Sequence, residues 1–465
     1  MFAGKTPGSP RPCPTGRRGA PCYFGPVRRD LDDRIRELES ARTVRITGRV
    51  RSLVGLAVRA TAPGAKVGEL VHILRRGGEP PLPAEVVGFM DEDALVLPLG
   101  AAEGVGPEDA VECSGSPLRI RCSNALLGRV LDGLGAPMDG GATLVGDTWD
   151  VVRPAPSPLD RHRIARALPT GVRAIDALLT FGEGQRVGLF AGSGVGKSTL
   201  LGQIARGAEA DVVVVCLVGE RGREVREFLD ESLGSEGLAR AVVVCATSDQ
   251  PALVRMKSAH TATAIAEWFR GQGKRVLLLM DSVTRFARAA REVGLAAGEP
   301  PARRGYPPSA FAALPALLER SGTGGTGSIT AIYTVLVEGN DMEEPIADEV
   351  RGILDGHVVL SRALAERGRF PAIDVGQSLS RVMGAITTDT QRAHATRLRA
   401  WIAHYEDKRD LVLLGAYKAG ADALLDEALA RQGNIERFLA QPSHEHIALN
   451  DSVDALAALV GGRPN

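Results

Sequence analysis

The sequence predicts an α/β protein with three folded parts: a small N-terminal β-barrel, a central domain on a mostly parallel sheet, and a C-terminal α-helical domain. Three observations support this fold class. Short β-rich runs separated by Gly, Pro and Asp turns fill residues 44–114, apolar runs alternate with helical stretches over 171–383, and apolar residues recur at helical spacing from Thr387 onward. At roughly 100–200 residues per domain, 465 residues suffice for about three domains.

Composition narrows the class of protein. Lysine plus arginine and aspartate plus glutamate each total 56, so the formal net charge is zero, which argues against a globally basic nucleic-acid binder. Aromatic residues make up 4%, too few to favour base-stacking surfaces. With 44% hydrophobic and 24% charged residues, the chain has the balance of a folded protein. We therefore expect no nucleic-acid partner.

The cysteines and the lengths of the apolar runs predict where in the cell the protein is located. The six cysteines form no Cys-x-x-Cys pair and no His/Cys ligand spacing, so we expect free thiols in a reducing compartment. Apolar runs such as 212–218 are far shorter than the roughly 20 residues of a membrane-spanning helix. The first 25 residues lack the continuous apolar core of a secretory signal. The expected location is the cytoplasm.

The first two segments precede the folded domains. Residues 1–26 are rich in Pro and Gly, a composition that predicts a disordered tail. In residues 27–42, apolar side chains fall three or four apart among charged ones, which predicts a short amphipathic helix. This helix either docks a partner or packs on its neighbouring domain, and the pattern does not choose between the two.

The barrel is expected over residues 43–115. Its β-rich runs are short and end at Gly, Pro or Asp turns, which is typical of a small closed barrel. Linker-like sequence follows at 126–141 and in the proline-rich stretch 151–158. The expected barrel strands are residues 44–50, 70–74, 85–89 and 94–99.

The central domain is expected over residues 116–385, followed by the helical domain over 386–465. Near-continuous apolar strands separated by helices belong in a buried, mostly parallel sheet, because helices cover both of its faces. No internal repeat is found. The expected central strands are residues 186–191, 211–218, 241–246 and 276–280.

The strongest motif is a glycine-rich loop between the first of these strands and a helix that begins near Lys197. Its glycines let backbone N–H groups converge on phosphate oxygens, the helix N-terminus adds partial positive charge, and the lysine supplies a cation for the β and γ phosphates. Ser198 offers a hydroxyl to magnesium. Ala191 stands where the strict pattern has Gly, a minor departure. The nucleotide-binding residues are Gly192, Ser193, Gly194, Val195, Gly196, Lys197, Ser198 and Thr199.

Two other uses of such glycines are excluded. A dinucleotide fingerprint needs a third glycine at position 197, which is lysine. A nucleophile elbow needs glycine at 191 and 195, which are Ala191 and Val195. The predicted ligand is therefore a nucleoside triphosphate, with Mg²⁺ as its metal.

Two acids stand at predicted strand ends. Asp281 follows the apolar run 276–280, at the sheet edge where ligands bind, and is the candidate that holds magnesium directly or through its water. Glu220 follows the strand 211–218 and is the candidate carboxylate that polarises the attacking water. On spacing alone, Glu220 is equally well an ordinary acid at the start of a charged helix.

Five segments together resemble the ATPases of flagellar and virulence type III protein export, which are relatives of the catalytic subunit of rotary ATP synthases. The resemblance runs from about residue 44 to about residue 441, and it implies a RecA-like fold for the P-loop domain. The Gly-Tyr-Pro-Pro-Ser and Glu-Pro-Ile-Ala-Asp sequences favour export over energy coupling. The segments are residues 192–198, 219–224, 281–287, 298–309 and 338–348.

The resemblance implies roles for the residues already singled out. Lys197 and Ser198 match the phosphate and magnesium positions, Glu220 the residue that activates water, and Asp281 the acid beside the magnesium. ATP is the implied nucleotide. The charged-helix interpretation of Glu220 becomes the weaker one.

The resemblance also implies residues that the loop does not reveal. Arg221 and Arg285 match arginines on the γ-phosphate side, and Phe370 matches an aromatic that stacks on adenine, with a core phenylalanine as its alternative. Synthase relatives place a second aromatic after a Gln-Pro pair, but here Ser443 follows Gln441-Pro442. The other wall of the adenine pocket is left open.

Arg381 matches the arginine that a neighbouring subunit inserts into the pocket. Such a residue neutralises charge on the transferring phosphoryl group, and comparable arginines are worth about 10³–10⁵ in rate. A surface salt bridge is the alternative. If the match holds, one chain lacks a complete site, and hydrolysis needs a ring of copies, six in this family.

The sequence thus favours a ring motor of a type III export apparatus that couples Mg-ATP hydrolysis to chaperone release and substrate entry. The implied partners are further copies, a regulator, a stalk protein and chaperone–substrate complexes, with peripheral attachment at the inner face of the cytoplasmic membrane through the export gate. The main alternative is a rotary ATP synthase catalytic subunit. Glu220 disfavours a non-catalytic scaffold, and Phe89 as the only aromatic between residues 44 and 114 disfavours an RNA-translocating hexamer.

Overall fold

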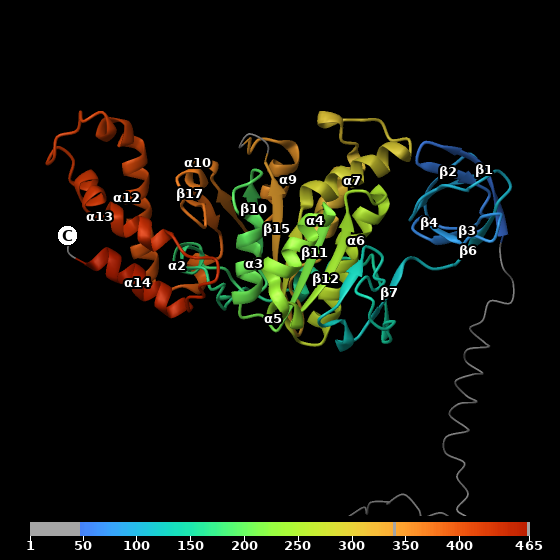
Figure 1. Ribbon diagram of the computed structural model, residues 1–465, viewed down its shortest axis with the longest axis horizontal. Coiled ribbons are helices and arrows are strands. Elements are labelled where there is room, and N and C mark those ends of the chain that lie inside the picture. Colours follow the sequence, from blue (N-terminus) through green and yellow to red (C-terminus); the bar gives the residue numbers. More distant parts are fainter. Residues whose placement is uncertain (1–46, 338–340, 463–465) are drawn as a thin grey trace, which may run out of the picture. The chain divides into compact units, whose positions relative to one another are not determined.

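The computed structural model describes residues 47–337 and 341–462 (Figure 1). The expected tail (1–26) and amphipathic helix (27–42) lie outside the described residues, as do residues 338–340 of one family-like segment. The boundaries predicted near residues 115 and 385 stay predictions, since the chain from residue 46 onward groups as one compact unit.

Six antiparallel strands close into the predicted barrel, in the order β1-β2-β5-β4-β3-β6. Alternate side chains such as Val58, Val71 and Val96 fill its interior, as the period of two along a strand requires. Two strands that the sequence did not indicate complete the ring, because runs of four residues are too short to show alternation. The strands are β1 (Thr47–Val54), β2 (Ala57–Ala60), β3 (Leu70–Leu74), β4 (Leu82–Met90), β5 (Asp93–Pro98) and β6 (Ala110–Cys113).

The linker interpretation of residues 126–141 is wrong. Within it, β8 (Val130–Asp132) pairs in parallel with β12 and forms the edge of the central sheet. Arg129 grips both carboxylate oxygens of Asp139 at 2.7 and 2.8 Å, and the same carboxylate accepts the backbone N–H of Val130. The ion pair within the loop positions this short strand at the edge of the sheet. The strand could not be predicted from the sequence, because its three residues show no apolar pattern.

The central sheet has the order β17-β16-β10-β15-β13-β11-β12-β8, and all neighbours are parallel except β17, which is antiparallel to β16. The predicted parallel sheet is confirmed, and β15, β16 and β17 extend it beyond the strands expected. The small strand β14 pairs with β15. The strands are β10 (Arg186–Ala191), β11 (Val212–Glu220), β12 (Ala241–Thr247), β13 (Arg275–Asp281), β14 (Gly322–Thr323), β15 (Ser328–Leu336), β16 (Gly356–Leu360) and β17 (Ile373–Ser380), with β7 (Arg119–Cys122) and β9 (Asp147–Asp150) as a separate pair.

Helices cover both faces of this sheet (Figure 1). Val212 and Val214 pack with α6, α7 and α8 on one face, whereas Val213 and Val215 pack with α2 and α3 on the other. Successive residues of β11 therefore meet two separate cores, which explains its unbroken apolar run. The helices are α2 (Arg173–Leu178), α3 (Lys197–Gly207), α4 (Gly222–Glu227), α5 (Gly234–Ala239), α6 (Ala252–Gly271), α7 (Val283–Ala296), α8 (Pro308–Leu318), α9 (Pro345–Ile353), α10 (Arg362–Glu366) and α11 (Met383–Ile386), with short turns η1 (Asn124–Leu126), η2 (Pro158–Asp160), η3 (Phe228–Leu233) and η4 (Arg303–Gly305).

The predicted C-terminal helical domain is confirmed as α12 (Asp389–Leu413), α13 (Ala423–Leu439) and α14 (Leu449–Gly461). Side-chain caps start the first two helices, since Thr388 accepts from the N–H of Gln391 and Asp422 accepts from Leu424 and Leu425. The buried ring of Trp401 anchors α12 in the core shared with α3. Within the described chain, no helix is long and apolar enough to cross a membrane.

Candidate functional site

The glycine-rich loop joins β10 to α3, as its position between a strand and a helix predicts. Gly194 and Gly196 adopt φ values of +79° and +87°, in the left-handed region that side chains rarely occupy. These turns bring the backbone N–H groups of the loop together with the N-terminus of α3, which begins at Lys197. The loop is therefore built as an anion cradle.

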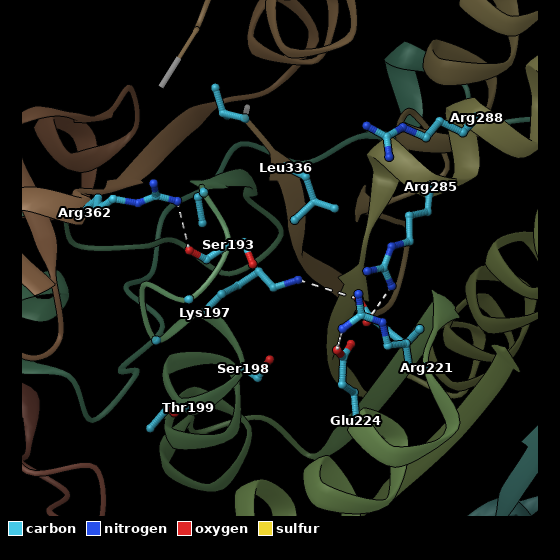
Figure 2. Close-up of a pocket in the computed structure, with 16 residues that line it drawn as sticks. Ser193, Lys197, Ser198, Thr199, Arg221, Glu224, Arg285, Arg288, Leu336 and Arg362 are labelled. Atoms are coloured by element: carbon cyan, nitrogen blue, oxygen red, sulfur yellow. Dashed lines mark hydrogen bonds and ion pairs between the residues drawn. The ribbon is translucent and has the colours of Figure 1, made fainter. Parts of the chain in front are cut away.

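A cavity of about 730 Å³ opens over this loop (Figure 2). Of loop residues 192–199, only Val195 does not line it, because its side chain is buried in the core and leaves only its backbone to face a ligand. Side chains from α4, α7 and α10 close in from the other sides. The lining residues are Ala191, Gly192, Ser193, Gly194, Gly196, Lys197, Ser198, Thr199, Glu220, Arg221, Glu224, Arg285, Arg288, Leu336, Val337 and Arg362.

Lys197 and the two strand-end acids meet in this cavity. The Lys197 ammonium group contacts the Asp281 carboxylate and lies 3.8 Å from Oε1 of Glu220. Asp281 ends β13 and also accepts a hydrogen bond of 2.8 Å from the Thr334 hydroxyl. Since β11 and β13 are parallel neighbours, their carboxyl ends lie side by side, which is why acids 61 positions apart in the chain converge.

Glu220 has the most perturbed environment of these groups. Its side chain is 8% exposed, and Nη1 of Arg285 lies 2.5 Å from its Oε2. In the charged form its buried Oε1 lacks a hydrogen-bond donor among the described residues. Burial raises the pKa of Glu220 to about 7, helped by a hydrogen bond that its protonated form donates to Glu224 and by the charge of Asp281, against the opposing effects of Lys197 and Arg285.

The donors around the cavity fit a triphosphate with a divalent cation. Arginines and Lys197 surround the loop with positive charge, while Asp281 and the Ser198 hydroxyl offer hard oxygen ligands beside it. Glu220 lines the same cavity, and its Oε1, to which none of the described residues donates a hydrogen bond, can accept one from a water molecule. The residues present therefore suit Mg-ATP.

The arginines of the site come from separate elements. Arg285 on α7 also donates to the carbonyl of Gly219 at 2.8 Å, so it ties the end of β11 to α7. Arg221 is 79% exposed and pairs with Glu224 at 3.0 Å. Both residues line the cavity, as the resemblance implies.

Three charged lining residues were not among those that the sequence predicted. Arg288 lies one turn of α7 after Arg285, and this spacing could have indicated it, whereas Glu224 lies on α4, just beyond the strand that ends in Glu220. Arg362 on α10 donates to the carbonyl of Ser193 at 3.4 Å. No signal pointed to it, because the strand that precedes α10 was not expected.

Phe370 lies against the loop. A Cβ atom placed on Gly196 would sit 3.3 Å from the Phe370 ring, and the side chain is 47% exposed. Its partly open position disagrees with a core phenylalanine and suits an aromatic that receives a base. Gln441 holds the Phe370 carbonyl through a backbone hydrogen bond of 2.9 Å.

The segment around Ser443, where synthase relatives place a second aromatic residue, contacts α3. Arg206 of α3 donates to the Ser443 carbonyl at 2.8 Å, and Gln203 donates to the carbonyl of Glu445 at 3.2 Å. This stretch fastens the C-terminal domain to the helix that carries Lys197. It supplies no second aromatic wall.

Arg381 lies at the opposite edge of the sheet from the cavity. β16 runs parallel to β10, and antiparallel β17 places Ser380 opposite Gly356, so Arg381 stands beside the start of β10 while the loop follows its end. About five residues of strand, roughly 17 Å, separate these two levels. Among the described residues the exposed Arg381 guanidinium has no hydrogen-bond or ion-pair partner, so it is not part of a surface salt bridge.

Comparison with known families assigns a family to the nucleotide-binding domain and to the C-terminal helical domain. Residues 171–380 match the nucleotide-binding domain of the ATP synthase alpha/beta family. Residues 387–458 match the T3SS EscN ATPase C-terminal domain. The second match favours the export branch over the synthases.

Individual relatives agree with these matches. The flagellum-specific ATP synthase of Bacillus subtilis (strain 168) is 50% identical over 416 residues, 89% of this chain and 95% of that protein. The type 3 secretion system ATPase of Xanthomonas euvesicatoria is 51% identical over 425 residues, 91% of this chain and 96% of that protein. The solved structure of the assembled ATPase EscN with its central stalk EscO, from the enteropathogenic E. coli type III secretion system, has a TM-score of 0.82 at 46% identity and covers 89% of this chain and 100% of that chain. The chain therefore belongs to the type III secretion and flagellar export ATPases of the ATP synthase alpha/beta family, and it is an ATP hydrolase.

Proposed function

We propose that this ATPase forms a ring of six copies that couples Mg-ATP hydrolysis to protein export, releasing substrates from chaperones and promoting their entry into the export channel. The assembly of EscN and its complex with the stalk EscO support a ring with a stalk partner. A regulator and peripheral attachment at the inner face of the cytoplasmic membrane, through the export gate, belong to the same proposal.

One observation carries the ring requirement. Lys197, Asp281 and Glu220 meet at the carboxyl edge of the sheet, whereas the Arg381 guanidinium has no partner in the described part of the chain and stands at the amino edge, too far to serve the same cavity. A cation left free on an exposed edge is available to another copy. Each nucleotide site therefore consists of one chain's loop and acids and the next chain's Arg381.

The roles within one site follow from their surroundings. The loop N–H groups and Lys197 bind the phosphates, and Lys197 exchanges its carboxylate contacts for phosphate oxygens. Ser198 and Asp281 hold Mg²⁺, which neutralises phosphate charge when bound. Phe370 stacks on adenine beside Gly196.

Glu220 handles the proton of the reaction. Its Oε1, which receives no hydrogen bond from the described residues, orients a water molecule toward the γ phosphorus and accepts the proton that this water loses. The new P–O bond forms as the bond from the γ phosphorus to the bridging oxygen breaks, and ADP leaves with that electron pair. Arg285, and Arg381 of the neighbour, balance the charge that spreads over the phosphoryl oxygens.

A mixing experiment tests the shared site. Arg381→Ala and Glu220→Gln chains are each expected to be inactive alone. In mixed rings some interfaces combine an intact Glu220 with an intact Arg381, so ATP hydrolysis should return. Glu220→Gln mixed with Lys197→Ala is the matched control, since both lesions lie in the chain's own half-site and no intact site forms. Mixed rings that demonstrably exchange subunits and yet stay inactive would refute the shared site.

The export role is tested in cells. Replacing the chromosomal copy with the Glu220→Gln variant should stop export of substrates while the ring still assembles. Continued export at the normal level would show that export does not depend on ATP hydrolysis by this protein.

A further inference from the structure

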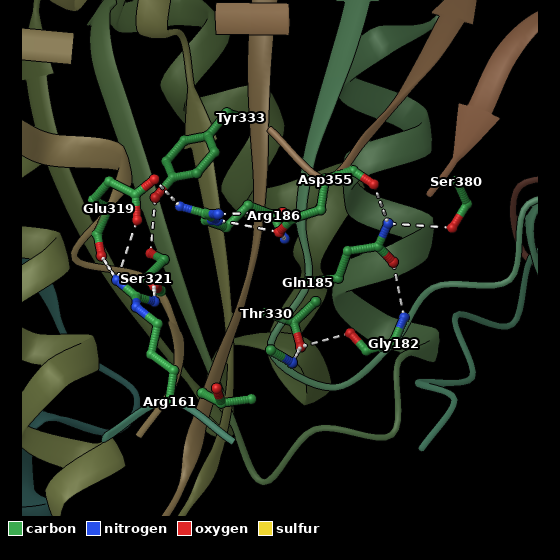
Figure 3. A network of polar contacts seen from close by, with 12 residues as sticks. Arg161, Gly182, Gln185, Arg186, Glu319, Ser321, Thr330, Tyr333, Asp355 and Ser380 are labelled. Atoms are coloured by element: carbon green, nitrogen blue, oxygen red, sulfur yellow. Dashed lines mark hydrogen bonds and ion pairs between the residues drawn. The ribbon is translucent and has the colours of Figure 1, made fainter. Parts of the chain in front are cut away.

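A network of polar groups lies at the amino edge of the central sheet, away from the nucleotide cavity (Figure 3). At its centre is Arg186, the first residue of β10. Its guanidinium group pairs with Asp355 through two contacts, Nε to Oδ2 at 3.1 Å and Nη2 to Oδ1 at 3.2 Å, and with Glu319 at 2.6 Å. Arg186 is 14% exposed, so this pair is held in a partly dry environment.

Gln185 joins this network to the segment that ends in Arg381. Its buried amide accepts the N–H of Gly182 at 2.9 Å and donates to the carbonyl of Asp355 at 3.1 Å and to the Ser380 hydroxyl at 3.2 Å. The same Asp355 carbonyl accepts the backbone N–H of Arg381 at 3.0 Å. The backbone N–H of Arg381 and the side chain of the preceding Ser380 are thus both tied to the Gln185–Asp355 pair.

The backbone around this point is closely packed. A Cβ atom on Gly356, the residue after Asp355, would lie 2.6 Å from the carbonyl oxygen of Leu379 and 3.2 Å from Nε2 of Gln185. The β16 and β17 backbones therefore approach each other closely beside Asp355 and Arg381, and only a glycine fits at position 356. Charge stabilisation of a transition state depends on such fixed placement, since a displacement of about 1 Å can cost about 10² in rate.

We propose that Gln185 and Asp355, with Ser380, are positioning residues that hold Arg381 in the orientation required at the neighbouring subunit's site. The inference rests on the proposed role of Arg381 at that site. Its consequence is that a lesion at Gln185 impairs the adjacent copy's site and leaves the chain's own site intact.

Two variants test this. Gln185→Leu removes the hydrogen bonds of the amide with Gly182, the Asp355 carbonyl and the Ser380 hydroxyl, and Ser380→Ala removes the last of these with little risk to folding. We expect kcat to fall about 10- to 100-fold for Gln185→Leu and about 2- to 10-fold for Ser380→Ala, at an unchanged KM for ATP. Ser380→Thr, which keeps the hydroxyl, should retain activity. Ser321→Ala is the matched control, because it removes a network hydroxyl whose hydrogen-bond partner among residues 47–337 and 341–462 is Tyr333 alone, at 2.8 Å.

Mixing with Glu220→Gln chains then locates the defect. Glu220→Gln keeps the Arg381 anchor intact, so mixed rings should hydrolyse ATP faster than the mean of the two separate proteins. If both positioning variants match Ser321→Ala in kcat, or if mixing yields no gain while Arg381→Ala still complements, the positioning role is wrong and the shared site stands. If mixing Arg381→Ala with Glu220→Gln chains restores no activity, the shared site is refuted, and the positioning role is refuted with it. If Gln185→Leu does not fold, Ser380→Ala decides alone.

Discussion

The ionisation of Glu220 predicts a steep acid limb in the pH profile of ATP hydrolysis. Glu220 must be charged to accept a proton, and its burial beside Glu224 and Asp281 raises its pKa from 4.5 to about 7. With that pKa, about 9% of the side chains are ionised at pH 6 and about 91% at pH 8, so kcat/KM should rise roughly tenfold between them. An unshifted glutamate would be about 97% ionised at pH 6, which would give a flat profile over this range.

The assay is kcat/KM for ATP at saturating Mg²⁺ from pH 5.5 to 9, since this ratio reports groups of the free enzyme. Glu224→Gln separates Glu220 from the titration of ATP itself, because it replaces the carboxylate that accepts from protonated Glu220 with a neutral amide, which is a weaker acceptor and can donate to the charged form. Its acid limb should move to lower pH, while Glu227→Gln, an exposed acid on the same helix, should leave the midpoint in place. A flat profile, or an identical midpoint in all three proteins, would refute the assignment of Glu220 as the proton acceptor.

Three further predictions concern the phosphate loop, the contact between Phe370 and adenine, and a buried ion pair in the core. Lys197→Ala should abolish ATP hydrolysis, measured by phosphate release, and near-normal turnover would remove the loop from the mechanism. Phe370→Ala should weaken ATP binding by about 1–3 kcal/mol through lost stacking, measured by calorimetry, and Phe370→Tyr should bind normally; equal affinities would contradict the contact with adenine. Glu267→Gln leaves the fully buried Arg320 without its charged partner, 2.8 Å away, so unfolding in urea should cost about 3–5 kcal/mol less, against about 0–1 for Glu227→Gln. Equal losses for the two would argue against a buried charge pair.

The barrel, the parallel sheet and the helical domain could be predicted because their signals are local. Alternation marks a half-buried strand, an unbroken apolar run such as 212–218 marks a strand buried on both faces, and helical spacing marks the C-terminal helices. The edge strand at Val130–Asp132 was not predicted, because its three residues are positioned by an ion pair within the loop and by pairing with β12. Neither cause leaves a periodic trace.

The phosphate loop and the two acids could be located from the sequence, because a Gly-rich turn before a helix and an acid after a buried strand are patterns of neighbouring residues. Parallel pairing then obliges Glu220 and Asp281 to share one edge. The positions of three other side chains follow from the packing of distant segments: Phe370 lies beside Gly196, Arg362 reaches the loop, and Arg381 stands at the far edge. Those placements depend on the antiparallel return of β17 and on contacts between distant segments, which no local pattern encodes.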